Sequence, residues 1–140
     1  GTEFLKRLSE GGPFPLITSC SPGWIKFGET YFPDLVENIS SCKSPQQMMG
    51  ALIKTYFSET WNISPEKIVS LSIMPCTAKK FEAERPEMND SGYKDVDYVL
   101  TTRELARMIR QSGINFDKIE GTTPDSLLSA YSGAGTIFGA

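Results

Sequence analysis

The feature that most constrains how this chain can fold is an apolar segment, residues 68–74, that ends at Pro75 and Cys76. Its aliphatic residues predict a buried strand, which the proline brings to an end. Lys79 and Glu82 follow Cys76 by three and six residues. A thiolate beside a cation suits a buried anionic metal centre. A lone cysteine at a strand end is, however, more often a small buried hydrophobe.

A second cysteine has a similar place near the N-terminus. Residues 14–18 predict a short strand that delivers Cys20 at its carboxyl end. Ser21 and Pro22 then predict a helix start, with serine as the N-cap and proline at the first helical position. Cys20 is therefore also expected where a strand ends and a helix begins.

Two further helices can be read from the pattern of apolar residues and caps. Residues 2–9 predict the end of an amphipathic helix. Ser44 and Pro45 predict a helix start, and Gln47 should complete a capping box in a helix that runs to about residue 57. We expect one face of this helix to fill the core, as methionine-rich faces usually do. That face consists of Met48, Met49, Leu52 and Tyr56.

A third strand, at residues 98–100, precedes a helix that Thr101 and Glu104 should cap together. Strands that alternate with helices predict an α/β fold with a mainly parallel sheet flanked by helices on both faces. Parallel strands present their carboxyl ends at one edge, which is where ligands bind in such sheets. We therefore expect Cys20 and Cys76 on the same side of the sheet, at the mouth of a groove.

Composition narrows the function further. With a net charge of −3 and a pI near 5.0, the chain lacks the basic stripe that a nucleic-acid partner needs. No apolar run approaches the ~20 residues that span a bilayer, so no membrane insertion is expected. No signal peptide is visible, which favours a cytoplasmic protein. The chain begins without methionine, so an upstream signal could still precede it.

The chain contains three cysteines and no histidine. An odd number of widely spaced cysteines is not a disulfide framework and fits a reducing compartment. The absence of histidine removes the commonest general base and every Ser-His or Cys-His nucleophile pair. No glycine-rich phosphate loop follows a strand, which argues against nucleotide chemistry. The remaining roles for the thiols are metal ligation or a place in the buried core.

Together the two cysteine stretches resemble the first two signature motifs of the catalytic domain of iron-only (FeFe) hydrogenases. These motifs read Thr-Ser-Cys-Cys-Pro-x-Trp and Met-Pro-Cys-x-x-Lys-x-x-Glu. The first is matched except that Ser21 stands where the second cysteine is expected, and the likeness extends to the segment 131–135. The second is matched at every fixed position, namely Met74, Pro75, Cys76, Lys79 and Glu82.

This resemblance implies an active centre in which a 4Fe–4S cubane is joined through a cysteine to a two-iron subsite. In the family four cysteines hold the cubane, one from each of the first two motifs and two from a third motif. The third motif is not visible before Ala140. Residues 1–140 are thus expected to form about the first half of a two-lobed catalytic domain, and to be inactive alone.

The activity that the resemblance implies is the reversible oxidation of hydrogen to protons and electrons. Its implied partners are H2, protons, the remaining half of the catalytic domain, and an electron carrier such as ferredoxin or an NAD(P)-linked subunit. The alternative is a non-catalytic iron–sulfur relative, either a cluster-assembly carrier or a gas-sensing homologue. A third cysteine motif beyond Ala140 is the feature that would separate the two.

The family's contacts to its cofactor carry over to both motifs. Cys76 matches one cubane ligand, and Ser21 occupies the position of another. An alkoxide can bind iron but is a worse ligand for such clusters than a thiolate. Three accounts therefore stay open: ligation by serine, a local shift that lets Cys20 bind, or altered chemistry in a divergent member. The remaining positions that match cofactor contacts are Lys79, Ser44, Pro45 and Met74.

The family's proton path carries over to the N-terminal part of the chain. Cys20 matches the terminal proton relay, a role that suits a thiol because it can both give and take a proton. Ser40 and Glu3 match the hydroxyl and carboxylate that continue the path outward, and Arg7 pairs with Glu3. Without the resemblance, Glu3 and Arg7 would be an ordinary i,i+4 helix pair. Cys42 matches no ligand, and we expect a buried structural thiol there.

Overall fold

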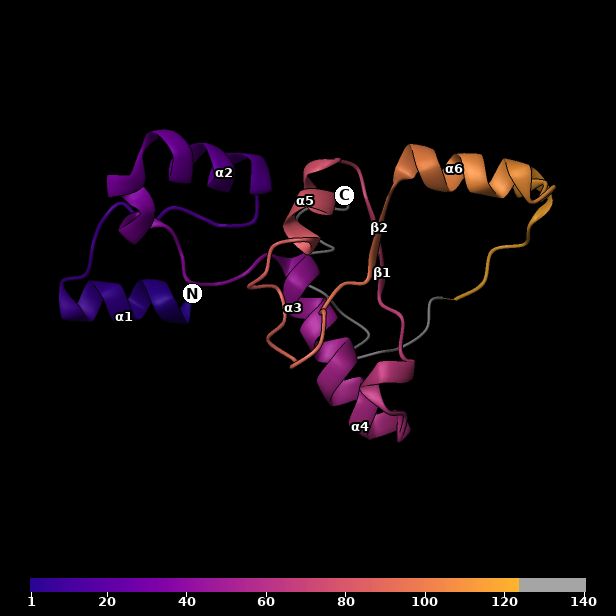
Figure 1. The fold of residues 1–140 in the computed structure, drawn as a ribbon, viewed down its shortest axis with the longest axis horizontal. Helices are drawn as coiled ribbons and strands as arrows, with labels where there is room; N and C mark the ends of the chain where they lie inside the picture. Colours follow the sequence, from indigo (N-terminus) through magenta and orange to yellow (C-terminus); the bar gives the residue numbers. More distant parts are fainter. Residues whose placement is uncertain (124–140) are drawn as a thin grey trace. The chain divides into compact units, whose positions relative to one another are not determined.

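Residues 1–123 are described by the computed structural model, in which the chain falls into two compact units, residues 1–108 and residues 109–140. The segment 131–135 lies outside the described residues. Figure 1 shows the course of the chain, whose helices are α1 (Thr2–Glu10), α2 (Pro22–Tyr31), α3 (Pro45–Leu52), α4 (Ser58–Trp61), α5 (Ala78–Ala83) and α6 (Thr102–Gln111). The strands are β1 (Leu71–Met74) and β2 (Tyr98–Thr101), and short 3-10 turns cover Pro33–Asn38, Pro65–Lys67 and Phe116–Lys118.

The two strands form a parallel pair, which confirms the predicted α/β class. Met74 lies opposite Thr101, so the carboxyl ends of β1 and β2 are in register. Helix α5 lies in the connection between them, as the crossover between parallel strands requires. The buried apolar cluster beside the sheet consists of Ala83, Val96 and Val99, and Met74 packs against it. The end of β1 that leads to the second motif is therefore anchored in the core.

The strand predicted at residues 14–18 is wrong. This segment makes only an isolated parallel bridge, between Ile17 and Ile39. The bridge has two hydrogen bonds, from the Ile17 N–H to the Asn38 carbonyl at 2.9 Å and from the Ser40 N–H to the Ile17 carbonyl at 2.7 Å. Pro15 interrupts the segment and has no N–H to donate, which works against a longer ladder. The bridge nevertheless places Ser40 next to the segment that leads to the first motif.

Helix α3 buries the opposite face from the one that the sequence predicts. Its inward positions are polar or small, with Gln46, Gln47 and Gly50 all buried. At Gly50 an added Cβ would lie 2.5 Å from the Asp95 carbonyl oxygen and 2.7 Å from Val96. Glycine is therefore what allows α3 to approach the segment before β2 so closely. The face predicted to fill the core is exposed, by 44% at Met48, 39% at Met49, 38% at Leu52 and 49% at Tyr56.

A turn of π-helix, Ile53–Phe57, continues α3 towards α4 and carries a buried ion pair. Lys54 is 4% exposed, and its ammonium lies 2.8 Å from an Asp97 carboxylate oxygen and 2.5 Å from the Ile68 carbonyl. The same Asp97 oxygen accepts the Ser70 N–H at 2.7 Å. These contacts join the π-helical turn after α3 to the residues that come just before β1 and β2. They also hold residues 68–70 before β1, which is why the strand begins only at Leu71.

The predicted helix caps form where their partners are local. Thr101 and Glu104 make a complete capping box, since the Thr101 N–H donates to the Glu104 carboxylate at 2.8 Å and the Glu104 N–H donates to the Thr101 hydroxyl at 3.2 Å. The Ser44 hydroxyl accepts the Gln47 N–H at 3.4 Å. The Gln47 amide does not complete that box, because it makes no hydrogen bond within residues 1–123.

None of the helices in residues 1–123 is both long and apolar enough to cross a membrane.

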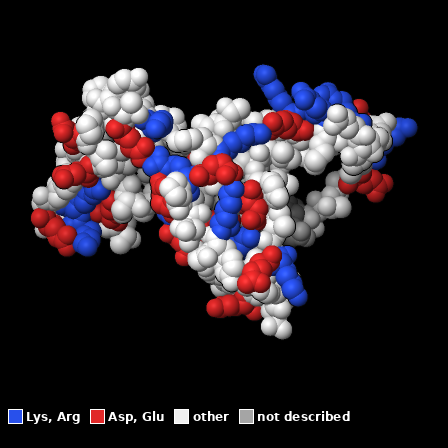
Figure 2. Space-filling view, viewed as in Figure 1, with Lys and Arg blue, Asp and Glu red and all other residues white. Residues whose placement is uncertain are grey.

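Charges of both signs alternate over much of the face shown in Figure 2. Several of them are paired within the first unit. Lys43 lies 2.8 Å from Asp90, which joins the segment before α3 to the loop of residues 84–97, and Lys94 lies 2.6 Å from Glu84 within that loop. Ion pairs at the surface contribute little stability individually.

Candidate functional site

The two cysteine motifs meet in the structure through a partly buried hydrogen bond. Lys79, in the first turn of α5, donates from its ammonium to the carbonyl oxygen of Cys20 at 2.7 Å. Cys20 leads into α2, and Cys76 lies in the turn between β1 and α5. Both thiols are free and exposed. The structure therefore brings the loop before α2 and the loop before α5 together, as the sequence motifs imply.

A buried carboxylate holds Lys79 in this position. Glu82 is 4% exposed and accepts three side-chain donors: the Lys79 ammonium at 3.1 Å, the Ser44 hydroxyl at 2.8 Å and the Gln46 amide at 3.1 Å. The Gln46 oxygen in turn accepts the Ser72 hydroxyl of β1 at 2.8 Å. Buried charges need this degree of pairing, because an uncompensated one is costly. Lys79 and Ser44, both predicted to face the cofactor, thus belong to one network.

The network also brings helix N-termini together. The Cys20 carbonyl lies just before α2, and Ser44 is the N-cap of α3. Both helices begin with a proline at their first position, and both point their N-terminal ends at Lys79 and Glu82 through the contacts just described. Helix N-termini and an ammonium group favour a negatively charged ligand nearby. The two helix N-termini therefore favour an anionic group at this edge, while the buried Glu82 carboxylate offsets the charge of Lys79.

Ser21 is at the N-cap of α2 but does not cap it with its side chain. Its backbone is extended, with φ −101° and ψ 105°, and no hydrogen bond reaches its hydroxyl from the first turn. The predicted side-chain cap is thus wrong, although the Ser21 carbonyl accepts the Ile25 N–H at 3.0 Å. The Ser21 side chain is exposed and has no helix-capping role.

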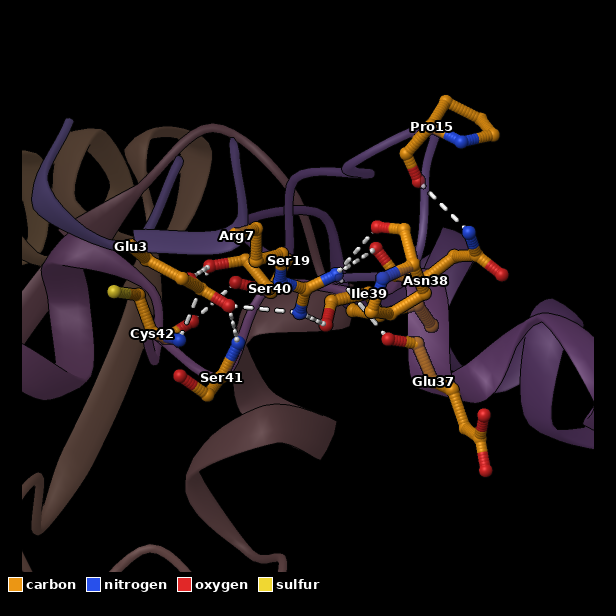
Figure 3. Close-up of polar contacts among 11 residues, drawn as sticks. Glu3, Arg7, Pro15, Ser19, Glu37, Asn38, Ile39, Ser40, Ser41 and Cys42 are labelled. Carbon is orange, nitrogen blue, oxygen red and sulfur yellow. Dashed lines mark hydrogen bonds and ion pairs between the residues drawn. The ribbon is translucent and has the colours of Figure 1, made fainter. Parts of the chain in front are cut away.

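Glu3 is the centre of a second polar cluster, shown in Figure 3. One carboxylate oxygen accepts Arg7 at 2.8 Å and the Ser41 N–H at 3.1 Å, and the other accepts the Ser40 hydroxyl. These contacts lower the pKa of Glu3 to about 2, first through the Ser40 hydroxyl and then through the Ser41 N–H and Arg7. The structure thus brings together Glu3, Arg7 and Ser40, three of the four residues predicted for the proton path.

Arg7 does more than pair with Glu3 along its own helix. Its guanidinium also donates to backbone carbonyl groups at distances between 2.9 and 3.3 Å, which crosslinks α1 to two other segments. The carbonyl groups belong to Pro13, Glu37, Asn38 and Ile39. The planar guanidinium of arginine carries several N–H donors and can bind several carbonyl groups at once, whereas a lysine would offer a single ammonium group. The pair is therefore part of a tertiary contact rather than an isolated helix pair.

The cluster around Glu3 connects to the first motif through backbone groups. The Cys42 N–H donates to the Ser40 hydroxyl oxygen at 3.2 Å, and the Cys42 carbonyl accepts the Ser19 hydroxyl. Ser19 immediately precedes Cys20. In residues 1–123 the Cys20 thiol makes no direct hydrogen bond to Ser40, so this link passes through Ser19 and Cys42. The predicted burial of Cys42 is wrong, since its thiol is exposed; nothing in the sequence indicated that its backbone would join the two clusters.

A cavity of about 490 Å³ lies between the two polar clusters. Arg7, Ser40 and Cys42 line one side, and Glu82 and Arg85 line another. A space of this size can hold several water molecules. Arg7 and Ser40 of the predicted proton path and Ser44 and Glu82 of the network around Lys79 therefore line a common volume.

The described residues offer only part of a cluster site. Across residues 1–123 no three Cys, His, Asp or Glu side chains gather in a way that could hold a metal ion. A cubane requires four ligands of the cysteine type, and Cys76 with either Cys20 or Ser21 could supply at most two of them. The donors in residues 1–123 thus fit only part of a cubane, and the remaining ligands would have to come from elsewhere.

Comparison with known proteins agrees with this geometry. The whole of residues 1–140 matches the family model for the iron only hydrogenase large subunit, C-terminal domain. Iron hydrogenase 1 of Clostridium pasteurianum is 49% identical over 99% of this chain, which covers 24% of that protein. The periplasmic Fe hydrogenase large subunit of Nitratidesulfovibrio vulgaris is 50% identical over 99% of the chain and 34% of that protein.

Solved structures show the same similarity. An apo FeFe-hydrogenase variant from Chlamydomonas reinhardtii superimposes with a TM-score of 0.82 at 41% identity, over 96% of this chain and 34% of that one. The cytosolic iron-sulfur assembly component 3 of Bos taurus is a more distant relative, 36% identical over 93% of the chain and 29% of that protein. The chain thus spans about a quarter to a third of the length of the relatives it matches.

Proposed function

Since the chain belongs to the family of the iron-only hydrogenase large subunit, C-terminal domain, we propose that it is the first part of a hydrogenase catalytic domain. The complete protein would interconvert H2 with protons and electrons. The observation that carries this proposal is the hydrogen bond from Lys79 to the Cys20 carbonyl, because it joins the two cysteine motifs at one anion-binding edge. Residues 1–140 alone would lack a third cysteine motif and be inactive.

The cofactor of this site would be a 4Fe–4S cubane with an attached two-iron subsite, which supplies the redox and hydrogen-splitting chemistry when bound. Cys76 and either Ser21 or Cys20 would be ligands of the cubane. The Lys79 ammonium would stabilise negative charge beside the cluster, because Glu82 keeps it in place at the edge of the pocket. Ser44, Pro45 and Met74 would form the wall next to the subsite.

The proton route would lead from Cys20 past Ser40 to Glu3. The Ser40 hydroxyl already donates to Glu3, and Arg7 fixes the carboxylate on its other side. A carboxylate with a pKa of about 2 is a weak base, so Glu3 would accept a proton only when its contacts to Ser40 and Arg7 rearrange. Water in the neighbouring cavity would bridge the Cys20 thiol and the Ser40 hydroxyl.

The electron carrier would be ferredoxin or an NAD(P)-linked subunit. One relative, 46% identical over 99% of the chain, is named an NADP-reducing hydrogenase subunit. A cytoplasmic location stays a prediction, since another relative at 50% identity is named a periplasmic hydrogenase. The free state of all three cysteines suits a reducing environment.

The second candidate is a role in iron–sulfur cluster assembly, which a relative of 36% identity carries in its name. Glu3, Arg7 and Ser40 favour the hydrogenase, because a carrier of clusters has no need of a fixed path for protons. The test is to produce the complete protein, assemble its cluster anaerobically, and measure H2 release with a chemically reduced viologen dye. Hydrogen release supports the hydrogenase, and an iron-loaded protein without it supports the assembly role.

Residues 1–140 produced alone provide a simpler test of the ligand count. Two motifs cannot surround a cubane that needs four ligands. We therefore expect no stable 4Fe–4S cluster after anaerobic reconstitution. Four irons per chain in a monomer, with the visible absorbance of a cubane, would contradict this ligand count.

A further inference from the structure

Arg85 makes a contact that neither cysteine motif includes. It follows the end of α5, and its guanidinium binds both carboxylate oxygens of Glu29 in α2, at 3.0 and 2.6 Å. Its third nitrogen lies 2.5 Å from Glu87. The Arg85 side chain is only 19% exposed and that of Glu29 is 34% exposed. Two parallel hydrogen bonds of this kind fix direction as well as distance.

The same two helices also meet around an aromatic ring. The Arg85 guanidinium lies 5.8 Å from the centre of the Phe81 ring in α5, and the Lys26 ammonium of α2 lies 6.0 Å from it. The contact with Arg85 lowers the pKa of Glu29 below its usual value, through hydrogen bonding first and charge second. Both partners of the pair are thus charged at neutral pH.

The pair of Arg85 and Glu29 lies towards the other end of α2 and α5 from their first link. At their N-terminal ends the helices are joined by Lys79, which donates to the Cys20 carbonyl. Towards their C-terminal ends they are joined by Arg85 and Glu29. A single contact would leave the helices free to pivot about it. Two contacts at opposite ends fix the angle between them, and with it the position of the loops at their N-termini.

We propose that Arg85 is a positioning residue, which sets the separation between the Cys20–Ser21 loop and the Cys76 loop by clamping α2 to α5. The proposal rests on the proposed function in so far as these loops hold the cluster. Lysine cannot replace Arg85, because it offers a single ammonium in place of the planar fork that binds Glu29. The clamp acts on the loops themselves and does not require a bound cofactor.

The test is hydrogen exchange of the complete protein without its cofactor, followed by mass spectrometry. We expect Arg85→Ala to speed exchange about fivefold or more in peptides from both loops, residues 18–25 and 74–80. Arg85→Lys should have nearly the same effect. The exchanged pair Arg85→Glu with Glu29→Arg, made together with Glu87→Gln so that the new carboxylate does not face the one that now binds Arg85, should return the rates to within about twofold of the wild type.

Lys94→Ala is the matched control, because it breaks the exposed pair with Glu84 next to Arg85 in the chain. It should leave both loops unchanged. Exchange that stays slow in Arg85→Ala would overturn the proposal. So would an equal increase in β2, which would show general destabilisation, or a failure of the exchanged pair to restore slow exchange.

A second measurement asks whether the clamp matters for the cluster. After anaerobic reconstitution, Arg85→Ala should release iron to a chelator several-fold faster than the wild type and show a broader paramagnetic signal of the reduced cubane. An unchanged release rate and signal would overturn the link between clamp and cluster. If the wild type assembled no cluster, the proposed function would be contradicted, while the exchange rates would still decide the role of Arg85.

Discussion

The ammonium group of Lys79 donates a 2.7 Å hydrogen bond to the carbonyl oxygen of Cys20, which lies 59 residues earlier in the chain. This contact makes the position of the first motif depend on a side chain of the second. Glu82 holds the same ammonium from the other side at 3.1 Å. The lysine therefore serves two purposes that the sequence motif does not separate: it supplies positive charge, and it fastens one loop to the other.

Removing the Lys79 side chain should leave Glu82 as a buried charge without its counter-ion. We expect Lys79→Ala to lower the free energy of unfolding by about 3 kcal/mol, the usual cost of breaking a buried pair. Thermal and urea unfolding of the cofactor-free catalytic domain would measure this. The double variant Lys79→Met with Glu82→Gln should recover much of the loss, because it removes both charges. A loss below ~0.5 kcal/mol in Lys79→Ala would contradict a buried pair.

Gly50 should tolerate no side chain. A Cβ there would lie 2.5 Å from the Asp95 carbonyl oxygen, and such overpacking typically costs about 1–3 kcal/mol. Gly50→Ala should therefore destabilise the domain by that amount in urea unfolding. Gly23 in α2 is the matched control, since nothing lies within 4 Å of an added Cβ. Gly23→Ala should be neutral or slightly stabilising, and equal effects at both positions would contradict the close approach of α3 to Asp95.

The contacts of Glu3 predict a particular pH dependence. Its pKa falls from 4.5 to about 2 in the folded protein, so the folded state binds the proton less well than the unfolded state. The stabilisation from Glu3 is thus fully present above pH ~4.5 and is lost as the pH falls towards 2. Glu3→Gln should be less stable than the wild type at neutral pH, and the two curves should converge in that acidic window. A difference that is constant from pH 7 to pH 2 would show that the charge of Glu3 is not involved.

The roles of Cys20 and Ser21 can be distinguished by substituting each residue separately. In the assembled enzyme, Cys20→Ala should reduce H2 turnover by more than ~10²-fold, the usual lower value of a positioned acid–base group, while iron content stays unchanged. Loss of the cluster would instead mean that Cys20 is the iron ligand. Ser21→Cys should slow the loss of iron to a chelator, because a thiolate binds such clusters better than an alkoxide. Faster loss in that variant would argue against Ser21 as a ligand position.

Local features of the fold could be predicted from the sequence. The capping box of Thr101 and Glu104 forms as expected, because its donors and acceptors lie within one turn of helix. The strand ending at Met74 is also present, since an apolar run followed by proline has few alternatives, but it begins at Leu71 rather than at residue 68. The predicted burial of this strand is wrong, because Leu71 and Ile73 are exposed within the described residues. In the candidate site, the contacts among Glu3, Arg7 and Ser40 agree with the residues that the family resemblance selected.

Features that depend on distant partners could not be predicted. Residues 14–18 contain β-forming residues, but Pro15 interrupts them and they make only one bridge, at Ile17. The inner face of α3 and of the π-helical turn after it is polar because Gln46 and Lys54 find partners on distant segments, and no periodicity of apolar residues indicates that. The pair between Arg85 and Glu29 joins residues 56 positions apart, so its charges look like an ordinary solvated surface in the sequence.

The most direct test of the central claim is to measure iron, the cubane spectrum and H2 release together, in the complete protein and in its Cys76→Ala variant. The two cysteine motifs are proposed to hold a 4Fe–4S cluster, with Cys76 as a ligand. The wild type should assemble the cluster and release H2 from a reduced viologen dye, and Cys76→Ala should lose both the cubane spectrum and the activity. A Cys76→Ala variant that keeps its cubane and its H2 release would contradict the account.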